Sequence, residues 1–264
     1  MSILNCLKDK VEINMNLEKM IDETKAEYYF DLSNFRFREV FEGHQYVWDV
    51  LKELDKYIIN KLKELGKGDR SGVRAGAYVA DNVHLGNGTT VDHTAVIHGP
   101  TIIGANCEIR AGAQFRGNVL VGDGAVLGGE YKSSILFDEA NAPHYCYVGN
   151  SIVGYRTNMA AGVVTSPHNF SWTPIKIKIG NQEYETGMTK IGSIVGDGTM
   201  VGSNCVLNPG SLIGQDSVIY PLISWRGFLP SQKVVKSHLE IVDRDMSKGK
   251  LRVGPKGESG KLYN

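Results

Sequence analysis

The sequence lacks an excess of charge of either sign and lacks long apolar runs. Its 29 Lys and Arg residues balance 29 Asp and Glu residues, so its formal net charge is zero. Such a balance argues against a polyanion-binding surface, and we expect no nucleic-acid partner. The uninterrupted apolar runs are only a few residues long, far below the ~20 residues that a membrane-spanning helix needs. We therefore expect a cytoplasmic enzyme or binding module with no membrane partner.

Cysteine is also scarce. The four cysteines, Cys6, Cys107, Cys146 and Cys205, lie far apart and form no CxxC pair. No apolar signal segment precedes them, so nothing indicates export to an oxidising compartment. We interpret the chain as a reduced, cytosolic protein.

Glycine, by contrast, is abundant, with 31 residues and no collagen-like period. From Val73 onward an aliphatic or aromatic residue recurs at every sixth position. The ten consecutive positions are Val73, Val79, Leu85, Val91, Ile97, Ile103, Ile109, Phe115, Val121 and Leu127. A second, mostly small residue follows each of them four positions later, as Ala77 follows Val73, and Tyr131 is the large exception.

A six-residue period fits neither an α-helix nor a simple strand alternation. It is typical of a coil in which three hexapeptides close one triangular rung and successive rungs stack at the ~4.8 Å strand spacing. The large residue fills the interior, while small residues and glycine allow the corners. We therefore predict a mainly β protein, a left-handed parallel β-helix of hexapeptide repeats, which is a known exception to right-handed crossovers.

The period has two interruptions. The coil slips phase between Gly128 and Ile152, and a stretch at about 164–190 breaks the period and is expected to leave the coil as a long loop. Long loops on a rigid scaffold are often functional. We expect the coil to occupy residues 71–227, followed by a partly flexible C-terminal extension over residues 228–264.

Residues 1–70 are expected to form an α-helical segment in front of the coil. Between Leu32 and Leu65, apolar residues at helical spacing predict an amphipathic helix. These residues are Val47, Leu51, Leu54, Ile58, Ile59 and Leu62. We expect the apolar stripe to pack against the first rungs or a neighbouring subunit.

Three strings in the interrupted region are more specific than the repeat: Glu-x-Lys at Glu130, Pro-His-x-x-Tyr-x-Gly at Pro143, and Thr-Gly-x-x-Lys-x-Gly at Thr186. From about Ile103 to Ile219 the sequence resembles the acetyltransferase domain of the sugar-1-phosphate nucleotidylyltransferase/acetyltransferases, the archaeal-type versions most. The resemblance implies an N-acetyltransferase of nucleotide-sugar biosynthesis that uses acetyl-CoA. Its acceptor would be an amino-sugar 1-phosphate such as glucosamine 1-phosphate. The resemblance also implies a homotrimer and no metal requirement for acetyl transfer.

The resemblance implies two catalytic residues and two acetyl-CoA contacts. His144 is expected to be the general base that takes a proton from the acceptor amine, since an imidazole titrates near neutral pH. Asn158 matches a second active-site residue. Ala161 matches the position whose backbone N–H faces the thioester carbonyl, where it would stabilise the developing oxyanion. Ser203 matches a further acetyl-CoA contact.

The resemblance also implies a substrate-binding group. Lys132 and Tyr147 fall where the family binds the acceptor, the lysine against the sugar phosphate. Arg116 matches a phosphate-binding arginine by hexapeptide phase, and Arg110, six residues earlier, is the reserve candidate. A guanidinium suits phosphate oxygens because it can donate two parallel hydrogen bonds.

The sequence departs from the family at one string and leaves two alternatives open. The family's Gly-Ala-Gly-Thr reads Ala-Ala-Gly-Val from Ala160, and an asparagine expected shortly afterwards falls at Pro167, with Asn169 as its only replacement. No Gly-rich nucleotidylyltransferase loop is recognisable. One alternative is therefore a non-catalytic trimeric partner or regulatory module of a separate nucleotidylyltransferase. The other is a γ-carbonic-anhydrase-like zinc protein with His93 and His98 as ligands, although a third histidine at suitable spacing is missing.

Overall fold

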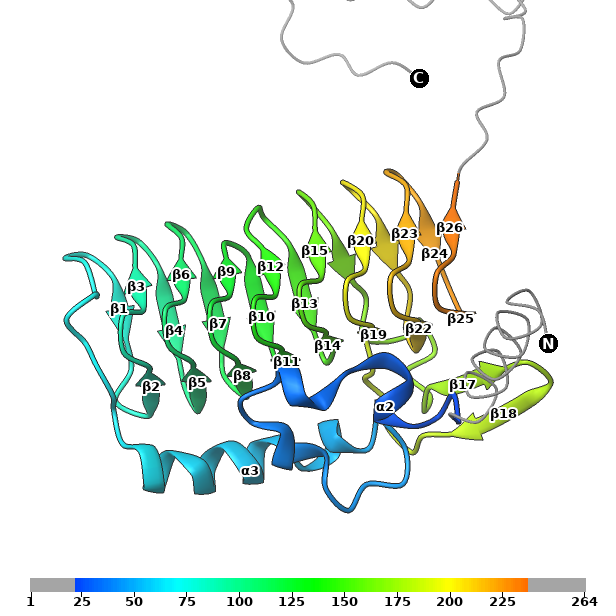
Figure 1. Ribbon diagram of the computed structural model, residues 1–264, viewed down its shortest axis with the longest axis horizontal. Coiled ribbons are helices and arrows are strands. Elements are labelled where there is room, and N and C mark those ends of the chain that lie inside the picture. Colours follow the sequence, from blue (N-terminus) through cyan, green and yellow to red (C-terminus); the bar gives the residue numbers. More distant parts are fainter. Residues whose placement is uncertain (1–21, 237–264) are drawn as a thin grey trace, which may run out of the picture.

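The computed structural model describes residues 22–236, which form a three-sided parallel β-helix with a helical segment along one side (Figure 1). The predicted hexapeptide-repeat fold is confirmed. Cys6 and most of the predicted C-terminal extension lie outside the described residues.

The three sides of the coil are eight-stranded parallel sheets, which we name face one, face two and face three in the order in which the chain enters them. Face one contains β1 (Tyr78–Val79), β4 (Val96–His98), β7 (Gln114–Arg116), β10 (Glu130–Lys132), β13 (Tyr147–Gly149), β16 (Val164–Thr165), β21 (Val206–Leu207) and β24 (Ser224–Trp225). Face two contains β2 (Val83–Leu85), β5 (Thr101–Ile103), β8 (Val119–Val121), β11 (Ser134–Leu136), β14 (Ile152–Val153), β19 (Ser193–Val195), β22 (Ser211–Ile213) and β25 (Phe228–Leu229). Face three contains β3 (Thr90–Val91), β6 (Glu108–Ile109), β9 (Val126–Leu127), β12 (Asn141–Ala142), β15 (Asn158–Met159), β20 (Met200–Val201), β23 (Val218–Ile219) and β26 (Val234–Val235).

The interior of the coil is the predicted column of large residues. All ten positions from Val73 to Leu127 belong to one apolar cluster, which continues through Val153, Val201 and Ile219 to the last rungs. Regular rungs repeat every 18 residues, as Ile97 pairs with Phe115. The six-residue period therefore marks the residues that are buried inside the prism. Burial of apolar surface is the dominant favourable contribution to folding.

The predicted phase slip begins at a shortened corner, Gly128–Gly129. Tyr131 pairs with Phe115, 16 residues earlier instead of 18, so it points inward and does not occupy the small-residue slot in which the sequence placed it. Its hydroxyl donates to the carbonyl of Ala142 at 2.6 Å and accepts the amide N–H groups of both glycines at 3.1 and 3.2 Å. The phenol thereby satisfies backbone groups that the shorter corner leaves unpaired.

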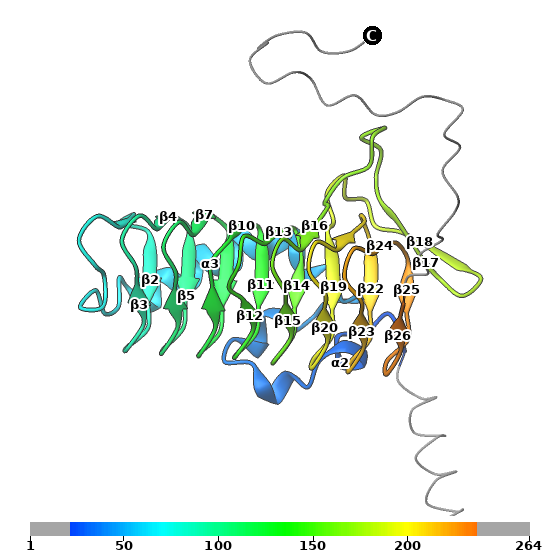
Figure 2. The same ribbon diagram turned by 90° about the horizontal axis from the view of Figure 1, so that it is seen from above.

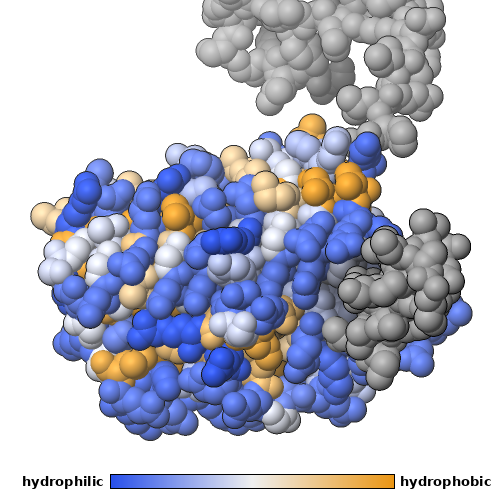
Figure 3. Space-filling model, viewed as in Figure 1, coloured by the Kyte–Doolittle hydropathy of each residue, from blue (hydrophilic) through white to orange (hydrophobic). Residues whose placement is uncertain are grey.

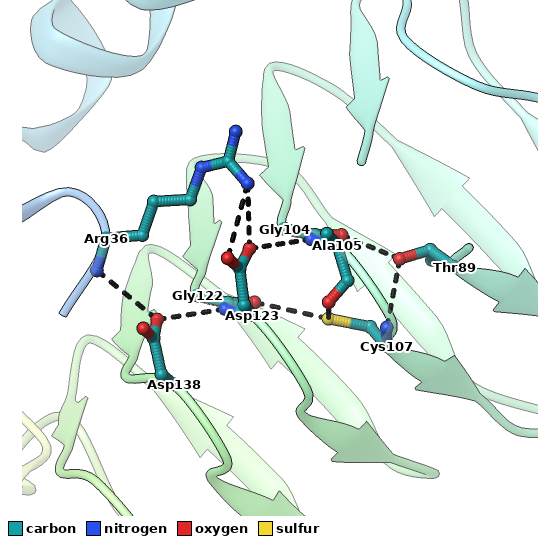
Figure 4. Close-up of polar contacts among 8 residues, drawn as sticks. All are labelled: Arg36, Thr89, Gly104, Ala105, Cys107, Gly122, Asp123 and Asp138. Atoms are coloured by element: carbon teal, nitrogen blue, oxygen red, sulfur yellow. Dashed lines mark hydrogen bonds and ion pairs between the residues drawn. The ribbon is translucent and has the colours of Figure 1, made fainter. Parts of the chain in front are cut away.

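The corner between faces two and three is held by aspartates (Figure 4). The Asp123 carboxylate accepts the amide N–H of Ala105 at 2.7 Å, one rung away, and Asp138 accepts that of Asp123 at 2.9 Å. Arg36 joins both, with Nη1 3.0 Å from Asp123 Oδ1 and its amide N–H 3.3 Å from Asp138 Oδ1. These contacts fasten the N-terminal segment to the coil.

The N-terminal segment covers face two. It comprises α2 (Ala26–Tyr29), the 3-10 helices η1 (Leu32–Asn34) and η2 (Arg38–Phe41), and α3 (Val50–Leu65). The prediction of one continuous helix from Leu32 is therefore wrong. The aromatic residues before Val50 turn toward the coil, where Phe35 stacks on Phe137 with the ring centroids 4.1 Å apart. This packing overrides the helical spacing of the apolar residues.

Helix α3 confirms the prediction that an amphipathic helix packs on the first rungs. It buries Val50, Leu54 and Ile58 in a second apolar cluster with the outward residues of face two. Ile59 does not belong to this stripe, since it is 46% exposed. The helix turns each residue by about 100° relative to the last, so the neighbour of a buried position faces away.

The predicted loop is an excursion between β16 and β19, and it contains an antiparallel hairpin of β17 (Lys176–Ile179) and β18 (Gln182–Glu185). Figure 2 shows it leaving the coil beside β16. Beyond it the coil continues to β26, past the expected end at residue 227, because β25 and β26 pair in parallel with β22 and β23. Across the described residues, none of the helices combines the length and apolarity needed to span a bilayer.

Candidate functional site

A pocket of about 370 Å³ lies on face one where the excursion leaves the coil. Three of the residues predicted to bind the acceptor line it together: Arg116 from β7, Lys132 from β10 and Tyr147 from β13. These strands are neighbours in face one. The remaining lining residues are Asn150, Val164, Ser166, Pro167, His168 and Lys190.

The pocket carries an excess of positive charge. Arg116 donates to Glu130, with Nη1 2.7 Å from Oε1, and this hydrogen bond raises the pKa of the guanidinium further. Glu130 offsets one of the three cations, and Lys132 and Lys190 remain. Such a concave, cationic surface suits an anionic group, and a phosphate in particular.

Tyr147 lines the pocket and is the first residue of β13, directly after the corner that carries His144. Its ring lies over Gly149, where an added Cβ would fall 2.6 Å from the phenol oxygen, so the glycine of the Pro-His-x-x-Tyr-x-Gly string makes room for the ring. Burial, and then the nearby Glu130 carboxylate, raises the pKa of Tyr147. The phenol is therefore a hydrogen-bond donor at neutral pH.

His144, Ala161 and Ser203 stand in one column at the corner between faces three and one. The carbonyl of His144 accepts the amide N–H of Gly162 at 3.0 Å, and that of Ala161 accepts the amide N–H of Asn204 at 2.9 Å. Ala161 is thus one rung beyond His144, and Ser203 is one rung beyond Ala161. His144 and Ala161 are exposed and Ser203 is half-exposed, so the column forms an open edge along the coil.

Asn158 and Arg110 lie elsewhere. Asn158 is on β15 of face three, half-exposed and paired with Asn141 and Met200, so a single chain does not bring it into the pocket on face one. Arg110 follows β6 and bonds to Glu108 at 2.8 Å. It is not among the residues that line the pocket.

The excursion supplies the pocket residues that sequence reasoning missed. Lys190 belongs to the Thr-Gly-x-x-Lys-x-Gly string, so that string was the available signal. Asn169, the suggested replacement for the family's asparagine, uses its side-chain amide to bond Thr173 at 3.1 Å. It lines a separate cavity of about 620 Å³ on the other side of the excursion, with Lys178 and Arg226. Asn169 is the only residue singled out in the sequence that lines that cavity, and none of those assigned to catalysis, to the acceptor or to acetyl-CoA lines it.

The structure does not support the zinc alternative. In residues 22–236 no three His, Cys, Asp or Glu side chains gather as a metal site would require. His84, another histidine of the coil, is buried with Nδ1 3.0 Å from the carbonyl oxygen of Gly66. Burial lowers the pKa of this imidazole, and its contact is structural.

Comparison with known proteins identifies the repeat and a group of relatives. The model of the bacterial transferase hexapeptide family (six repeats) matches residues 82–117. An uncharacterized acetyltransferase, YaiX of Escherichia coli O6:K15:H31 (strain 536 / UPEC), is 30% identical over 154 residues, which cover 58% of this chain and 67% of that protein.

Longer proteins match over a larger part of the chain. The bifunctional protein GlmU of Methanocaldococcus jannaschii is 30% identical over 193 residues, covering 64% of this chain and 44% of GlmU. The chain thus matches about half the length of the GlmU relatives. Among solved structures, a point mutant of AntD, an N-acyltransferase from Bacillus cereus in complex with dTDP and coenzyme A, matches with a TM-score of 0.28 and 15% identity. That match covers 72% of this chain and 90% of AntD.

Proposed function

Because this chain belongs to the hexapeptide-repeat transferase family and is an acyltransferase, we propose that it transfers an acetyl group from acetyl-CoA to an amino-sugar 1-phosphate. Glucosamine 1-phosphate is the first acceptor to test. The resemblance to the sugar-1-phosphate nucleotidylyltransferase/acetyltransferases would place the reaction in nucleotide-sugar biosynthesis. The free, buried thiols of Cys107, Cys146 and Cys205 suit a cytoplasmic enzyme.

The observation that carries this proposal is the pocket on face one beside an open corner. Arg116, Lys132 and Lys190 offer the charge that would bind the phosphate, and Tyr147, which also lines the pocket, lies three residues after His144 in the chain. Three residues of extended chain span at most about 10 Å. An acceptor with its phosphate in the pocket and its sugar across Tyr147 would therefore direct its amine toward the His144 corner.

The proposed reaction is a direct acyl transfer. The amine nitrogen attacks the thioester carbon, the new C–N bond forms, the C–S bond breaks, and coenzyme A leaves as its thiol. His144 takes the proton from the amine and returns it to the departing sulfur. The amide N–H of Ala161 is assigned to the developing oxyanion, and Ser203 to acetyl-CoA.

Asn158 and the exposed apolar residues support a homotrimer. Asn158 lies on a different face from the pocket, so it would meet an acceptor bound to a neighbouring copy. Exposed apolar side chains also lie along face three and the His144 corner near the C-terminal end of the coil (Figure 3). They are Tyr145, Met200, Tyr220, Leu222 and Val234. A cyclic trimer would bury them, since cyclic packing suits a three-sided prism, and light scattering should give three times the mass of the chain.

A thiol-release assay tests the activity. We expect coenzyme A release with glucosamine 1-phosphate or galactosamine 1-phosphate and none with glucosamine, since the pocket would then lack its anion. Inactivity across a panel of amino-sugar phosphates, together with no acetyl-CoA binding by calorimetry, would favour the non-catalytic partner instead.

A further inference from the structure

The excursion brings an imidazole, His168, into the pocket beside Lys190. The two ends of the excursion are tied together, because the amide N–H of Ile191 donates to the carbonyl of Pro167 at 2.8 Å. His168 directly follows Pro167 and Lys190 directly precedes Ile191, so the two residues flank this hydrogen bond. Their place at the rim of the pocket is therefore set by the backbone.

A tight turn after His168 fixes the plane of its ring. The amide N–H of Trp172 donates to the carbonyl of Asn169 at 3.3 Å, and the Asn169 side chain bonds Thr173. The turn returns the indole onto the imidazole, with ring centroids 4.2 Å apart and planes inclined by 19°. Lys190 Nζ lies 5.9 Å from the Trp172 ring centroid, so the three side chains form one unit.

The two nitrogens of His168 have different surroundings. Nδ1 is shielded from solvent and has no hydrogen-bond partner among the described residues. A shielded N–H without a partner is rarer and more costly than a shielded acceptor without one. The hydrogen of the neutral ring is therefore assigned to Nε2, which leaves that nitrogen as a donor.

We propose that His168 is a phosphate-binding residue that donates an Nε2–H hydrogen bond to the acceptor, and that Trp172 positions it. The proposal rests on the proposed function, since it takes the phosphate of the acceptor to be the anion in this pocket. A phosphate monoester carries close to two negative charges and three strong acceptor oxygens. Lys132 and Lys190 supply charge, and His168 supplies a directed hydrogen bond. A ring with its hydrogen on Nε2 cannot accept a proton there, so proton transfer stays with His144.

Two substitutions at one position test the role. A glutamine places its amide N–H near the position of Nε2–H, whereas alanine removes the donor. With glucosamine 1-phosphate, His168→Ala should raise KM roughly 10- to 100-fold, the loss of one hydrogen bond to a charged group. The variant should keep kcat and the KM for acetyl-CoA. His168→Gln should retain a KM within a few-fold of the wild type.

Two kinetic results would overturn the proposal. A fall in kcat of roughly 10²–10⁴-fold in both variants would make His168 the general base. An unchanged KM in His168→Ala would mean that the ring does not touch the acceptor.

Calorimetry with inorganic phosphate separates this proposal from the proposed function. If the wild type binds phosphate and His168→Ala binds it at least tenfold more weakly, the phosphate role stands even where no amino-sugar phosphate is acetylated. Equal phosphate affinity in both proteins, or none in either, refutes it.

Positioning by Trp172 has its own test. Trp172→Leu should raise the KM for glucosamine 1-phosphate and leave kcat unchanged, whereas Trp172→Phe should retain a near-normal KM because a ring can still stack. The control is Phe170→Ala, since Phe170 is fully exposed in the same turn and should alter neither constant. If the leucine and phenylalanine variants have equal KM values, stacking does not position His168.

Discussion

Faces one and two belong to the same coil and share its inward pattern, yet their outward residues differ. On face two the outward positions are apolar and buried under the N-terminal segment and the excursion, as Ile102, Leu120 and Ile194 are. On face one the outward positions include Arg116, Lys132 and other polar groups, and they remain open. The inward residues thus define the coil, while the outward residues decide whether a face is part of the core or part of a site.

The largest expected effect is at the open corner beside face one. His144→Ala should lower kcat roughly 10²–10⁴-fold, because it removes the proposed proton acceptor. Acetyl-CoA affinity and thermal stability should change little, since the side chain is exposed. Steady-state kinetics, calorimetry and thermal unfolding measure the three quantities. His93→Ala is the matched control, an exposed histidine between faces three and one near the other end of the coil. Retention of most turnover in His144→Ala would contradict the assignment.

The next effect concerns stability and lies on the covered face. Phe137→Ala should lower the free energy of unfolding by about 3–5 kcal/mol, because it leaves a cavity where Phe35 now stacks. The KM values of the folded protein should remain unchanged. Denaturant unfolding measures the loss. Tyr78→Ala, an aromatic residue 53% exposed on face one, should cost less than about 0.5 kcal/mol. Similar losses in the two variants would mean that face two is not a core.

A smaller effect is expected within the pocket on face one. Lys132→Ala removes a charge-assisted contact to the phosphate, which contributes roughly 1.5–3 kcal/mol. The KM for glucosamine 1-phosphate should therefore rise about 10- to 100-fold, while the KM for acetyl-CoA stays the same. Kinetics with each substrate varied in turn separates the two. Lys56→Ala, on the exposed side of α3, is the control, and an equal effect there would argue against a specific contact.

The smallest effect is a pH dependence where the N-terminal segment joins the coil. Asp197 accepts the amide N–H of Asp31 at 2.7 Å and that of Tyr155 at 2.7 Å, and burial raises the pKa of its carboxyl to about 6. The folded state then binds the proton of this carboxyl more tightly than the unfolded state does. The ionised carboxylate therefore destabilises the fold above pH 6, and this cost disappears as the pH falls.

Asp197→Asn removes this titration. The melting temperature of the wild type should therefore rise relative to the variant between pH 7 and pH 5, as measured by thermal unfolding in matched buffers. A constant difference between the two proteins would contradict the expected sign.

The fold could be predicted from the sequence almost completely, and the site only in part. The large residue at every sixth position was visible, and so were the motif residues Lys132 and Tyr147, which share a pocket. Tyr131 was misplaced because the corner at Gly128–Gly129 is two residues short, and counting residues does not show where between Gly128 and Ile152 the coil changes phase. The extent of the N-terminal helix was misjudged because Phe35 and its neighbours serve the packing on face two and not a helical stripe.

By itself the sequence determined the coil, because a six-residue period depends on local geometry and on burial within a single rung. Only the tertiary structure decided which face is covered, and that His168 and Lys190 return to the pocket formed by Arg116 and Lys132. Those positions depend on where the excursion folds back after many residues, which is set by contacts such as Ile191 with Pro167. A sequence repeat reflects constraints on the geometry and burial of neighbouring residues. A site between distant segments results from long-range packing, which no local pattern encodes.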